Sequence, residues 1–517
     1  MDLRTRIGAT VGGTAMLVAT LWAFYALWRG PASTSGAPNV LIILWDTVRA
    51  DRLSLYGHDA PTSPRLDALA ADAMVFDHAI SPGFWTLPAH ASLFTGLPVT
   101  AHGATFETPW LDDELTTMAE WFGAHGYDTY AWSTNPNVHP IRNLVQGVDA
   151  FHSPLGEAEN PLRHAVLQAT KDRRHPRDAS THVSPLWRPT PRKIPAIAGP
   201  IVPGDLTSWL QGRERQDRPF WAFVNLMEAH DPRLPTAESR ALMLGERTED
   251  SLALDGTPGR MRRATRGDEP YSERERQILL SVYDATIRDL DASTGELLDA
   301  LDAAGALDNT IVVLTSDHGE LFGEHDQYRH NSSLWEELVH VPLVLHYPAA
   351  IPARRVSEPV STGSVFATLC HLTGLAHPQV EHFDARNLLE APPEHVVTEA
   401  LDPLGKDGKN PMPERVLRTQ RAIYAGSWKA IWAEDGDHDL FDVQADPTEQ
   451  TDQLDEAVDR GDTMLGELAD WERLIPRRTP DVPANPGMLR ADGTYSKKPT
   501  NAVKMLQGLG YIEPEPK

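Results

Sequence analysis

The chain has 517 residues, and its 73 acidic side chains outnumber its 47 Lys and Arg side chains, which gives a formal net charge of −26 at pH 7. This balance argues against nucleic acid as a partner, because proteins that bind the phosphate backbone need clustered positive charge. The single cysteine, Cys370, excludes an internal disulfide and predicts a buried thiol, since it lies in an apolar segment.

Residues 1–36 are predicted to form a membrane anchor followed by a linker. Residues 7–28 carry no charge, and at about 1.5 Å per residue a helix of this length spans a bilayer core. Arg4 and Arg6 precede the run, which favours a cytoplasmic N-terminus and a body that is periplasmic or on the cell surface. The alternative is a signal peptide cut within residues 31–36, which are small and polar. Protease digestion of intact cells tests the orientation, since protection of the body would contradict it.

The remaining chain is predicted to form a large α/β domain over residues 37–391 and a smaller subdomain over residues 392–517. In the larger part, apolar strands alternate with helical patterns, which predicts a doubly wound, mostly parallel sheet. Two stretches interrupt this alternation: residues 151–217 are Pro-rich and locally basic, and residues 235–268 are irregular. The first is either an insertion over the functional site or toward the membrane, or a solvated loop with no role.

Polar side chains that can bind metals follow three of the predicted strands. They are Asp46 after residues 39–45, His230 after residues 220–226, and Asp317 with His318 after residues 310–315. Because the carboxyl ends of parallel strands meet at one edge of an open sheet, we expect these groups to lie close together. Carboxylate and imidazole ligands suit a divalent metal; zinc is expected, with calcium, magnesium and manganese as alternatives.

A candidate nucleophile, Thr86, stands at the start of a predicted helix. Pro88 can occupy the first turn of this helix and Gly96 can end it. The Thr86 hydroxyl is therefore expected at the positive end of the helix dipole. His90 lies four residues further, about one helical turn on. It can donate a hydrogen bond to a substrate oxygen, or it can form a hydrogen bond within the helix.

The second half of the chain carries a helix start signal and a set of short strands. A capping box formed by Ser272 and Glu275 predicts a long helix that ends near Ala304 and leads into the strand at residues 310–315. Beyond residue 392, short strands at 396–400, 421–424, 427–432 and 439–442 predict a small antiparallel sheet. An acidic helix is predicted over residues 456–474.

Several motifs in this order resemble the sulfatase family of the alkaline phosphatase superfamily. They are residues 38–43 (PNVLII) with 46–51 (DTVRAD), residues 86–96 (TLPAHASLFTG), residues 315–320 (TSDHGE), residues 335–337 (WEE), and residues 440–442 (LFD) before 445–447 (ADP). The resemblance covers nearly everything after the membrane segment except residues 151–217. It implies an alkaline phosphatase-like α/β fold and chemistry on sulfate or phosphate esters.

The chain also departs from the formylglycine sulfatases that it resembles. Those enzymes carry Cys or Ser followed by x-Pro-x-Arg, whereas this chain has Thr86 at the nucleophile position and His90 in place of the Arg. Thr cannot become formylglycine, so none is expected. Thr47 replaces one of the paired aspartates that family members use for calcium, and the Lys and His that hold the sulfate have no counterpart in residues 133–137.

With these departures the chain is similar to the Thr-nucleophile branch of the superfamily, which includes phosphoethanolamine transferases and nucleotide pyrophosphatases. That resemblance implies a set of site residues: the metal ligands Asp46, Thr86, Asp317 and His318, then His230 and His330 around the leaving group or a second metal, with Asn135 as a further candidate for substrate binding. His325 and His340 are predicted to be satisfied structural or surface groups.

The leading hypothesis is a membrane-anchored, metal-dependent enzyme that hydrolyses phosphate or sulfate esters. The reaction would pass through a covalent intermediate on Thr86. The ester substrate can be linked to a lipid or a glycan. One alternative is a transferase that passes a phospho-alcohol headgroup, of phosphoethanolamine type, to a lipid or glycan. Another is a non-catalytic binding protein built on the sulfatase fold. Metal analysis separates the last alternative, since a pseudoenzyme should purify without stoichiometric metal.

Overall fold

The computed structural model describes residues 36–155, 161–162, 165–166, 197–330, 333–378, 386–402 and 412–480. The predicted membrane segment at residues 7–28 lies outside these residues and stays a prediction. Within the described ranges, no helix has both the length and the apolar character needed to cross a membrane.

The core of the molecule is a nine-stranded sheet in the order β10-β2-β9-β6-β1-β5-β3-β4, with β11 paired to β2. The strand bounds are β1 Asn39–Trp45, β2 Met74–Ile80, β3 Asp128–Ser133, β4 Ala150–His152, β5 Phe220–Leu226, β6 Thr310–Thr315, β9 His340–His346, β10 Arg354–Val356 and β11 Val360–Ser361. β1 lies in the middle of the sheet, parallel to both β5 and β6. Only β9 among these strands runs antiparallel to its neighbours, β6 and β2. The prediction of a mostly parallel sheet is confirmed.

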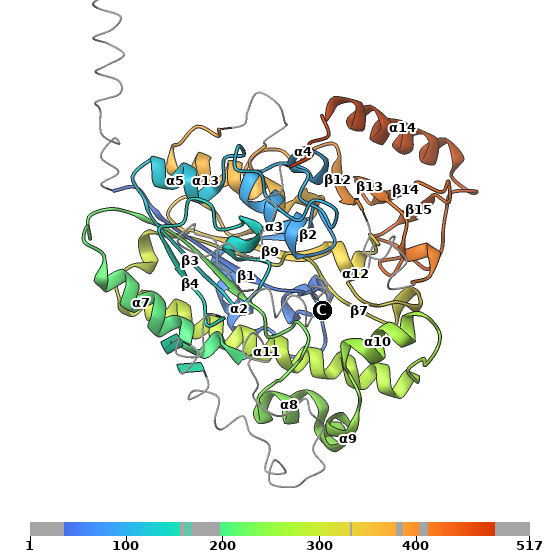
Figure 1. Ribbon diagram of the computed structural model, residues 1–517, viewed down its shortest axis with the longest axis horizontal. Coiled ribbons are helices and arrows are strands. Elements are labelled where there is room, and N and C mark those ends of the chain that lie inside the picture. Colours follow the sequence, from blue (N-terminus) through green and yellow to red (C-terminus); the bar gives the residue numbers. More distant parts are fainter. Residues whose placement is uncertain are drawn as a thin grey trace, which may run out of the picture.

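Helices cover both faces of this sheet (Figure 1). Alternate residues of β1 point to opposite faces, so Val40, Ile42 and Leu44 belong to one apolar core and Leu41, Ile43 and Trp45 to the other. The first core is closed by α3 (Thr86–Thr95), α5 (Met118–Ala124) and α13 (Val365–Thr373), and the second by α2 (Pro64–Leu69), α7 (Val202–Gly212) and α11 (Glu273–Ala303). Cys370 is buried in the first core, as predicted.

The long helix α11 begins and ends close to the predicted residues. The Ser272 side chain accepts from the Glu275 backbone N–H, and the Glu275 carboxylate accepts from the Ser272 N–H at 2.7 Å. This reciprocal capping box satisfies two of the N–H groups that a helix start leaves unpaired. The helix then leads the chain back to β6, which carries Asp317 at its carboxyl end.

Residues 235–268 were predicted to be irregular, and that prediction was wrong, whereas most of residues 151–217 lies outside the described residues and stays a prediction. Residues 235–268 form α8 (Ala237–Leu244), α9 (Thr248–Ala253) and α10 (Pro258–Thr265). Thr236 and Thr257 cap the first and last of these helices through their side chains. Within 151–217, β4 extends into the stretch and α7 packs on α11. Helices this short show too few turns for their apolar periodicity to be recognised.

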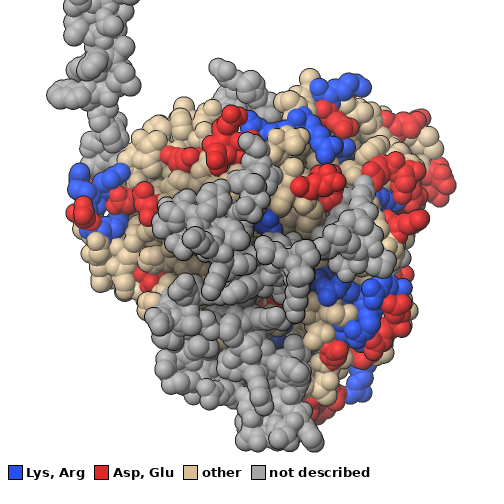
Figure 2. Space-filling view, viewed as in Figure 1, with Lys and Arg blue, Asp and Glu red and all other residues tan. Residues whose placement is uncertain are grey.

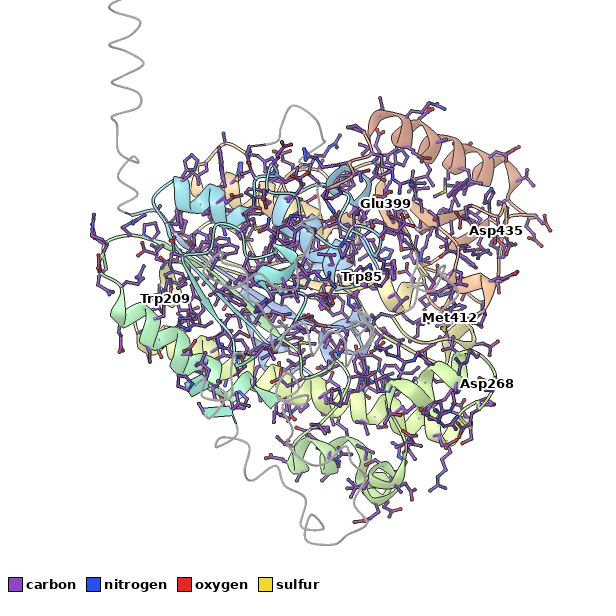
Figure 3. All side chains as sticks on the ribbon, viewed as in Figure 1. Trp85, Trp209, Asp268, Glu399, Met412 and Asp435 are labelled. Carbon is purple, nitrogen blue, oxygen red and sulfur yellow. The ribbon has the colours of Figure 1, made fainter. Side chains whose placement is uncertain are left out.

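A four-stranded antiparallel sheet forms the C-terminal subdomain, as predicted. It consists of β12 (Val396–Ala400), β13 (Gln420–Ala425), β14 (Trp428–Ala433) and β15 (Asp439–Asp442), with α14 (Val458–Leu474) packed on β13 and β14. Glu399, labelled in Figure 3, joins this sheet to the larger domain. Its carboxylate accepts from the Thr100 N–H of α4 (Val99–His102) at 2.8 Å and from Arg421 Nε at 3.1 Å.

Acidic and basic side chains are intermingled on the face shown in Figure 2. Among the described residues on this face, no continuous basic surface covers the molecule. The whole chain has a formal net charge of −26.

Candidate active site

The carboxyl ends of β1, β3 and β6 and the first turn of α3 bring five of the predicted residues together. Asp46 directly follows β1, Asn135 follows β3, and Asp317 with His318 follows β6, while Thr86 opens α3. The Asn135 amide nitrogen lies 2.6 Å from Asp46 Oδ2 and 3.4 Å from Thr86 Oγ1. A single amide therefore links a candidate metal ligand to the candidate nucleophile.

Asp46, Asp317 and His318 fit a divalent metal. One potential ligand atom from each lies within 4.8 Å of the others, and all three side chains are buried. Asp46 Oδ1, Asp317 Oδ2 and His318 Nε2 have no hydrogen-bond partner among the described residues. Buried polar atoms without partners are costly and rare, and two carboxylates with one imidazole are a common zinc donor set. These residues would hold the cation.

The backbone orients the Asp317 carboxylate so that one oxygen stays available. The N–H groups of Thr47 and His318 both donate to Asp317 Oδ1, at 3.1 and 2.9 Å. Thr47 adopts φ of 61°, which is unusual for a β-branched residue and costs about 1–3 kcal/mol. Tyr283 of α11 holds this turn by donating its hydroxyl to the Thr47 carbonyl at 2.5 Å. Thr47 thus contributes its backbone to the site, while its own hydroxyl contacts no described acceptor.

Burial controls the protonation of the three candidate ligands. It raises the pKa of Asp46 to about 8, with a further contribution from the nearby Asp317 charge, and it raises the pKa of Asp317 to about 7. Burial also lowers the pKa of His318. Without a cation, the pocket therefore favours neutral side chains. A bound cation would reverse that preference by stabilising both carboxylates.

Metal binding to this site is expected to depend steeply on pH. The pKa values of Asp46 and Asp317 are higher in the folded protein than in the unfolded chain, so the neutral carboxyl groups stabilise the metal-free fold. This contribution to the free energy of unfolding is fully present below pH ~4 and is lost as the pH rises through 7 and 8. The cation needs ionised ligands, so each carboxylate weakens binding by up to about 10-fold per pH unit below its pKa. The zinc-induced rise in Tm should therefore be much larger at pH 8 than at pH 5.

Thermal unfolding of chelator-stripped and zinc-loaded protein at both pH values measures this difference. The part of the zinc-induced rise in Tm that the Asp317→Asn variant lacks comes from zinc bound at this site. Equal zinc-induced shifts at pH 5 and pH 8 in the wild type would contradict the assignment of the two buried carboxylates.

Thr86 is the first residue of α3, and the helix ends at Gly96 with φ of 72°, as predicted. The nucleophile hydroxyl therefore lies at the helix end where the dipole is positive. His90 forms the hydrogen bond within the helix: its Nδ1 lies 2.8 Å from the Thr86 carbonyl oxygen and 3.6 Å from Asp317 Oδ2. Burial lowers the pKa of His90 to about 3, so the ring is neutral. The structure thus places His90 as a support for the Thr86 backbone.

His230 and His330 extend the site on the His318 side. The ring centroids of His318 and His330 are 4.6 Å apart, and those of His330 and His230 are 5.2 Å apart. His230 Nδ1 donates to the Asp231 carbonyl at 2.8 Å, and His330 Nδ1 lies 3.1 Å from Glu320 Oε1. Burial lowers the pKa of His230 to about 3 and that of His330 well below its usual value. Both rings are neutral at pH 7.

A family model described as Sulfatase matches residues 38–375. The chain belongs to the sulfatase family. The match spans all of the strands and helix ends that carry this site, and it identifies the protein as an enzyme that hydrolyses sulfuric esters or related esters.

Known relatives and solved structures agree with this assignment. The sulfatase-family chain is 27% identical over 435 residues to an ulvan-active sulfatase of Formosa agariphila, covering 81% of this chain and 77% of the relative. It is 27% identical over 400 residues to human iduronate 2-sulfatase, covering 70% and 66% of the two chains. The structure of a phosphonate monoester hydrolase of Agrobacterium radiobacter superposes with a TM-score of 0.63 at 21% identity. The superposition covers 89% of this chain and 100% of the hydrolase chain. This last likeness supports the fold.

Three residues of this sulfatase site were not predicted from the sequence. Glu320 accepts from Arg233 Nη2 at 2.5 Å and thereby faces His330 with its other oxygen. Asn225 donates to Asp46 Oδ2 at 3.3 Å and accepts from Ser133. A signal existed for Asn225, because an amide inside an otherwise apolar strand needs a partner. Arg233 gave no signal, since nothing in the sequence relates it to Glu320.

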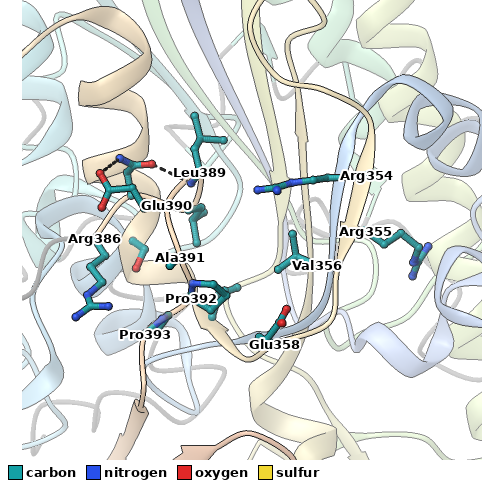
Figure 4. Close-up of a pocket in the computed structure, with 14 residues that line it drawn as sticks. Arg354, Arg355, Val356, Glu358, Arg386, Leu389, Glu390, Ala391, Pro392 and Pro393 are labelled. Atoms are coloured by element: carbon teal, nitrogen blue, oxygen red, sulfur yellow. Dashed lines mark hydrogen bonds between the residues drawn. The ribbon is translucent and has the colours of Figure 1, made fainter.

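A cavity of about 330 Å³ at the edge of the sheet is separate from the sulfatase site (Figure 4). It lies between β10 and the segment of residues 386–393, and β10 is four positions from β1 in the sheet. Arg354 and Arg386 line it together with Glu358 and Glu390. Arg355 also lines the cavity, so charges of both signs meet there.

Proposed function

We propose that this sulfatase-family enzyme hydrolyses sulfate or phosphate-type esters through a covalent intermediate on Thr86, with a divalent metal at Asp46, Asp317 and His318. The observation that carries the proposal is the Asn135 amide, which contacts both Thr86 Oγ1 and Asp46 Oδ2. It positions the hydroxyl beside the buried ligand atoms of Asp46, Asp317 and His318.

In the first step, Thr86 Oγ attacks the sulfur or phosphorus atom and the bond from that atom to the alcohol oxygen breaks. The alcohol leaves with a proton, and the acid group remains esterified to Thr86. In the second step, water attacks the same atom, and Thr86 recovers its proton as the acid is released. When bound, the metal supplies positive charge that stabilises the Thr86 alkoxide and the anionic ester. The Asn135 amide and the α3 dipole act in the same direction.

His330 is suited to accept a hydrogen bond from the attacking water. Its ring is neutral at pH 7 because burial and the positive charges of Arg329 and Arg233 oppose protonation. Glu320 lies against Nδ1 at 3.1 Å, so its carboxylate fixes the orientation of the ring. Arg233 in turn holds Glu320 in place.

Sulfated glycans are the proposed substrate class. Two relatives that cover most of this chain are named as an ulvan-active sulfatase and an iduronate 2-sulfatase. Thr86 allows a second possibility, because a phospho-alcohol bound to Thr can pass to a lipid or glycan hydroxyl instead of water. The two functions share the nucleophile and metal ligands, and they differ in the group that Thr86 carries and in the acceptor of that group.

A substrate panel on the full chain in detergent tests the proposal. The panel contains 4-nitrophenyl sulfate, 4-nitrophenyl phosphate, a phenylphosphonate monoester and a sulfated oligosaccharide, with protein made in a host that lacks formylglycine-generating activity. Turnover of at least one ester is expected. Repeating the assay with glycerol present separates hydrolysis from transfer by the ratio of the two products. A metal-loaded protein that turns over none of these esters and forms no adduct on Thr86 would favour the binding-protein alternative.

A further inference from the structure

A second group of potential metal ligands lies apart from the Asp46 site. His325 comes from the loop between β7 (Leu321–Phe322) and β8 (Tyr328–Arg329), Glu337 from α12 (Glu336–Val339), and Glu449 from the segment after β15. One nitrogen or oxygen atom from each lies within 4.8 Å of the others. The exposed fractions of the Glu337 and Glu449 side chains are 4% and 0%, and that of His325 is 11%.

The polar atoms of this group lack the hydrogen bonds that burial demands. Both carboxylate oxygens of Glu337 and Nε2 of His325 have no hydrogen-bond partner among the described residues. The nearest approach between them, His325 Nε2 to Glu337 Oε2, is 3.6 Å, which is too long for a hydrogen bond. Trp335 stacks on the His325 ring at 3.8 Å and 6°. The ring is therefore held in one plane, with its Nε2 near the Glu337 carboxylate.

The charges around Glu337 are not balanced by the side chains that face it. Five carboxylates meet two permanent cations here; the carboxylates are Asp51, Glu324, Glu336, Glu337 and Glu449, and the cations are Arg49 and Lys429. Lys429 Nζ lies 3.0 Å from Glu336 and 2.8 Å from Glu449, and Arg49 pairs with Glu324 at 2.7 Å. His78 and His340 face Glu336 from the other side. Glu337 has no Lys or Arg within ion-pair distance among the described residues.

We propose that His325, Glu337 and Glu449 bind a second divalent cation. One imidazole with two carboxylates suits a divalent cation such as zinc, and its charge would offset most of the surplus of carboxylates over permanent cations. Each carboxylate oxygen has more than one lone pair, so Glu449 can bind the cation and keep its bond to Lys429. The site is independent of the reaction at Thr86 and shares no ligand with the Asp46 site.

The cation would connect the C-terminal subdomain to the loop that carries Asp317 and His318. Gly319 follows His318, and its N–H donates to the Leu338 carbonyl of α12 at 2.8 Å. A Cβ atom at Gly319 would lie 2.0 Å from the Glu337 carbonyl oxygen, so α12 packs directly on this loop. Glu449 also accepts from the Glu336 N–H at 2.7 Å. A cation between Glu337 and Glu449 would therefore support the active-site loop from behind.

Metal analysis of purified full-length protein after dialysis against metal-free buffer tests the proposal. The wild type, grown with zinc, should hold two zinc ions per chain. Glu337→Gln and Asp317→Asn should each hold one, and the double variant should hold none. The matched control is Glu358→Gln, which changes an exposed carboxylate bonded only to Ser357 among the described contacts, and it should keep two.

The two sites fail separately in this experiment. Equal zinc in Asp317→Asn and in the double variant would overturn the second site. If Glu337→Gln loses one zinc and the double variant loses no more, the second site is supported and the site at Asp46, Asp317 and His318 is overturned. If Glu337→Gln does not fold, His325→Gln replaces it with the same expected count. X-ray absorption of zinc-loaded Asp317→Asn should show one nitrogen ligand from imidazole and oxygen ligands, and a spectrum without imidazole would contradict the assignment.

Discussion

Thr86→Ala is expected to reduce turnover of a good ester substrate by on the order of 10³-fold or more, as is usual when a covalent nucleophile is removed. The fold should survive, because the described partners of the Thr86 hydroxyl, the Asn135 amide at 3.4 Å and the Asp317 carboxylate, both lie within the site. The decisive measurement is the mass of the peptide containing residue 86 after quenching with substrate. A sulfuryl or phosphoryl adduct on Thr86 identifies the intermediate.

Three further variants control this result. Thr86→Ser should keep part of the activity, because only a methyl group is lost, whereas Thr86→Cys should bind zinc through its thiolate and turn over poorly. Thr95→Ala removes a hydroxyl from the same helix that donates to the Ala91 carbonyl at 2.7 Å and accepts from the Leu97 N–H at 3.3 Å, and it should keep normal turnover. Wild-type turnover by Thr86→Ala would mean that water attacks directly and that Thr86 only begins the α3 helix.

The placement of Asp46, Asp317 and His318 could be predicted because it follows from strand ends alone. Each of them directly follows a strand whose apolar run is easy to recognise, and parallel neighbours bring their carboxyl ends to one edge. The α3 helix was predictable for a similar reason, since Pro88 and Gly96 mark its two ends. Both features depend on short stretches of sequence, which a local pattern can describe.

The contacts that support the site could not be predicted, because they join distant segments. Arg233 and Glu320 are 87 residues apart in the chain, and no local pattern relates them. His325 was predicted to be a satisfied group, yet its Nε2 lacks a hydrogen-bond partner among the described residues and lies near Glu337. That environment arises only when the C-terminal subdomain brings Glu449 against α12. Long-range packing, within the larger domain for Arg233 and Glu320 and between the two domains for Glu337 and Glu449, determines these contacts.

Asp317→Asn is expected to abolish ester turnover and to lower zinc affinity by more than the roughly 10- to 100-fold that loss of a supporting group costs. The amide keeps an oxygen that can accept from the Thr47 and His318 N–H groups, so the loop should keep its shape. His318→Ala should have the same effect on zinc, because the imidazole ligand is lost. Isothermal titration calorimetry of zinc into chelator-stripped protein measures the zinc affinities of the two variants and the wild type.

The thermal stability of Asp317→Asn is expected to change in opposite directions with and without zinc. Burial raises the pKa of Asp317 to about 7, so at pH 8 the metal-free wild type carries an ionised group that its pocket disfavours, at a cost on the order of a few kcal/mol. The neutral amide avoids this cost. Without metal at pH 8, Asp317→Asn should therefore melt at or above the wild-type temperature, whereas with zinc it should melt below it. If the variant melts below the wild type in both conditions, Asp317 stabilises the fold directly, and its assignment as a metal ligand fails.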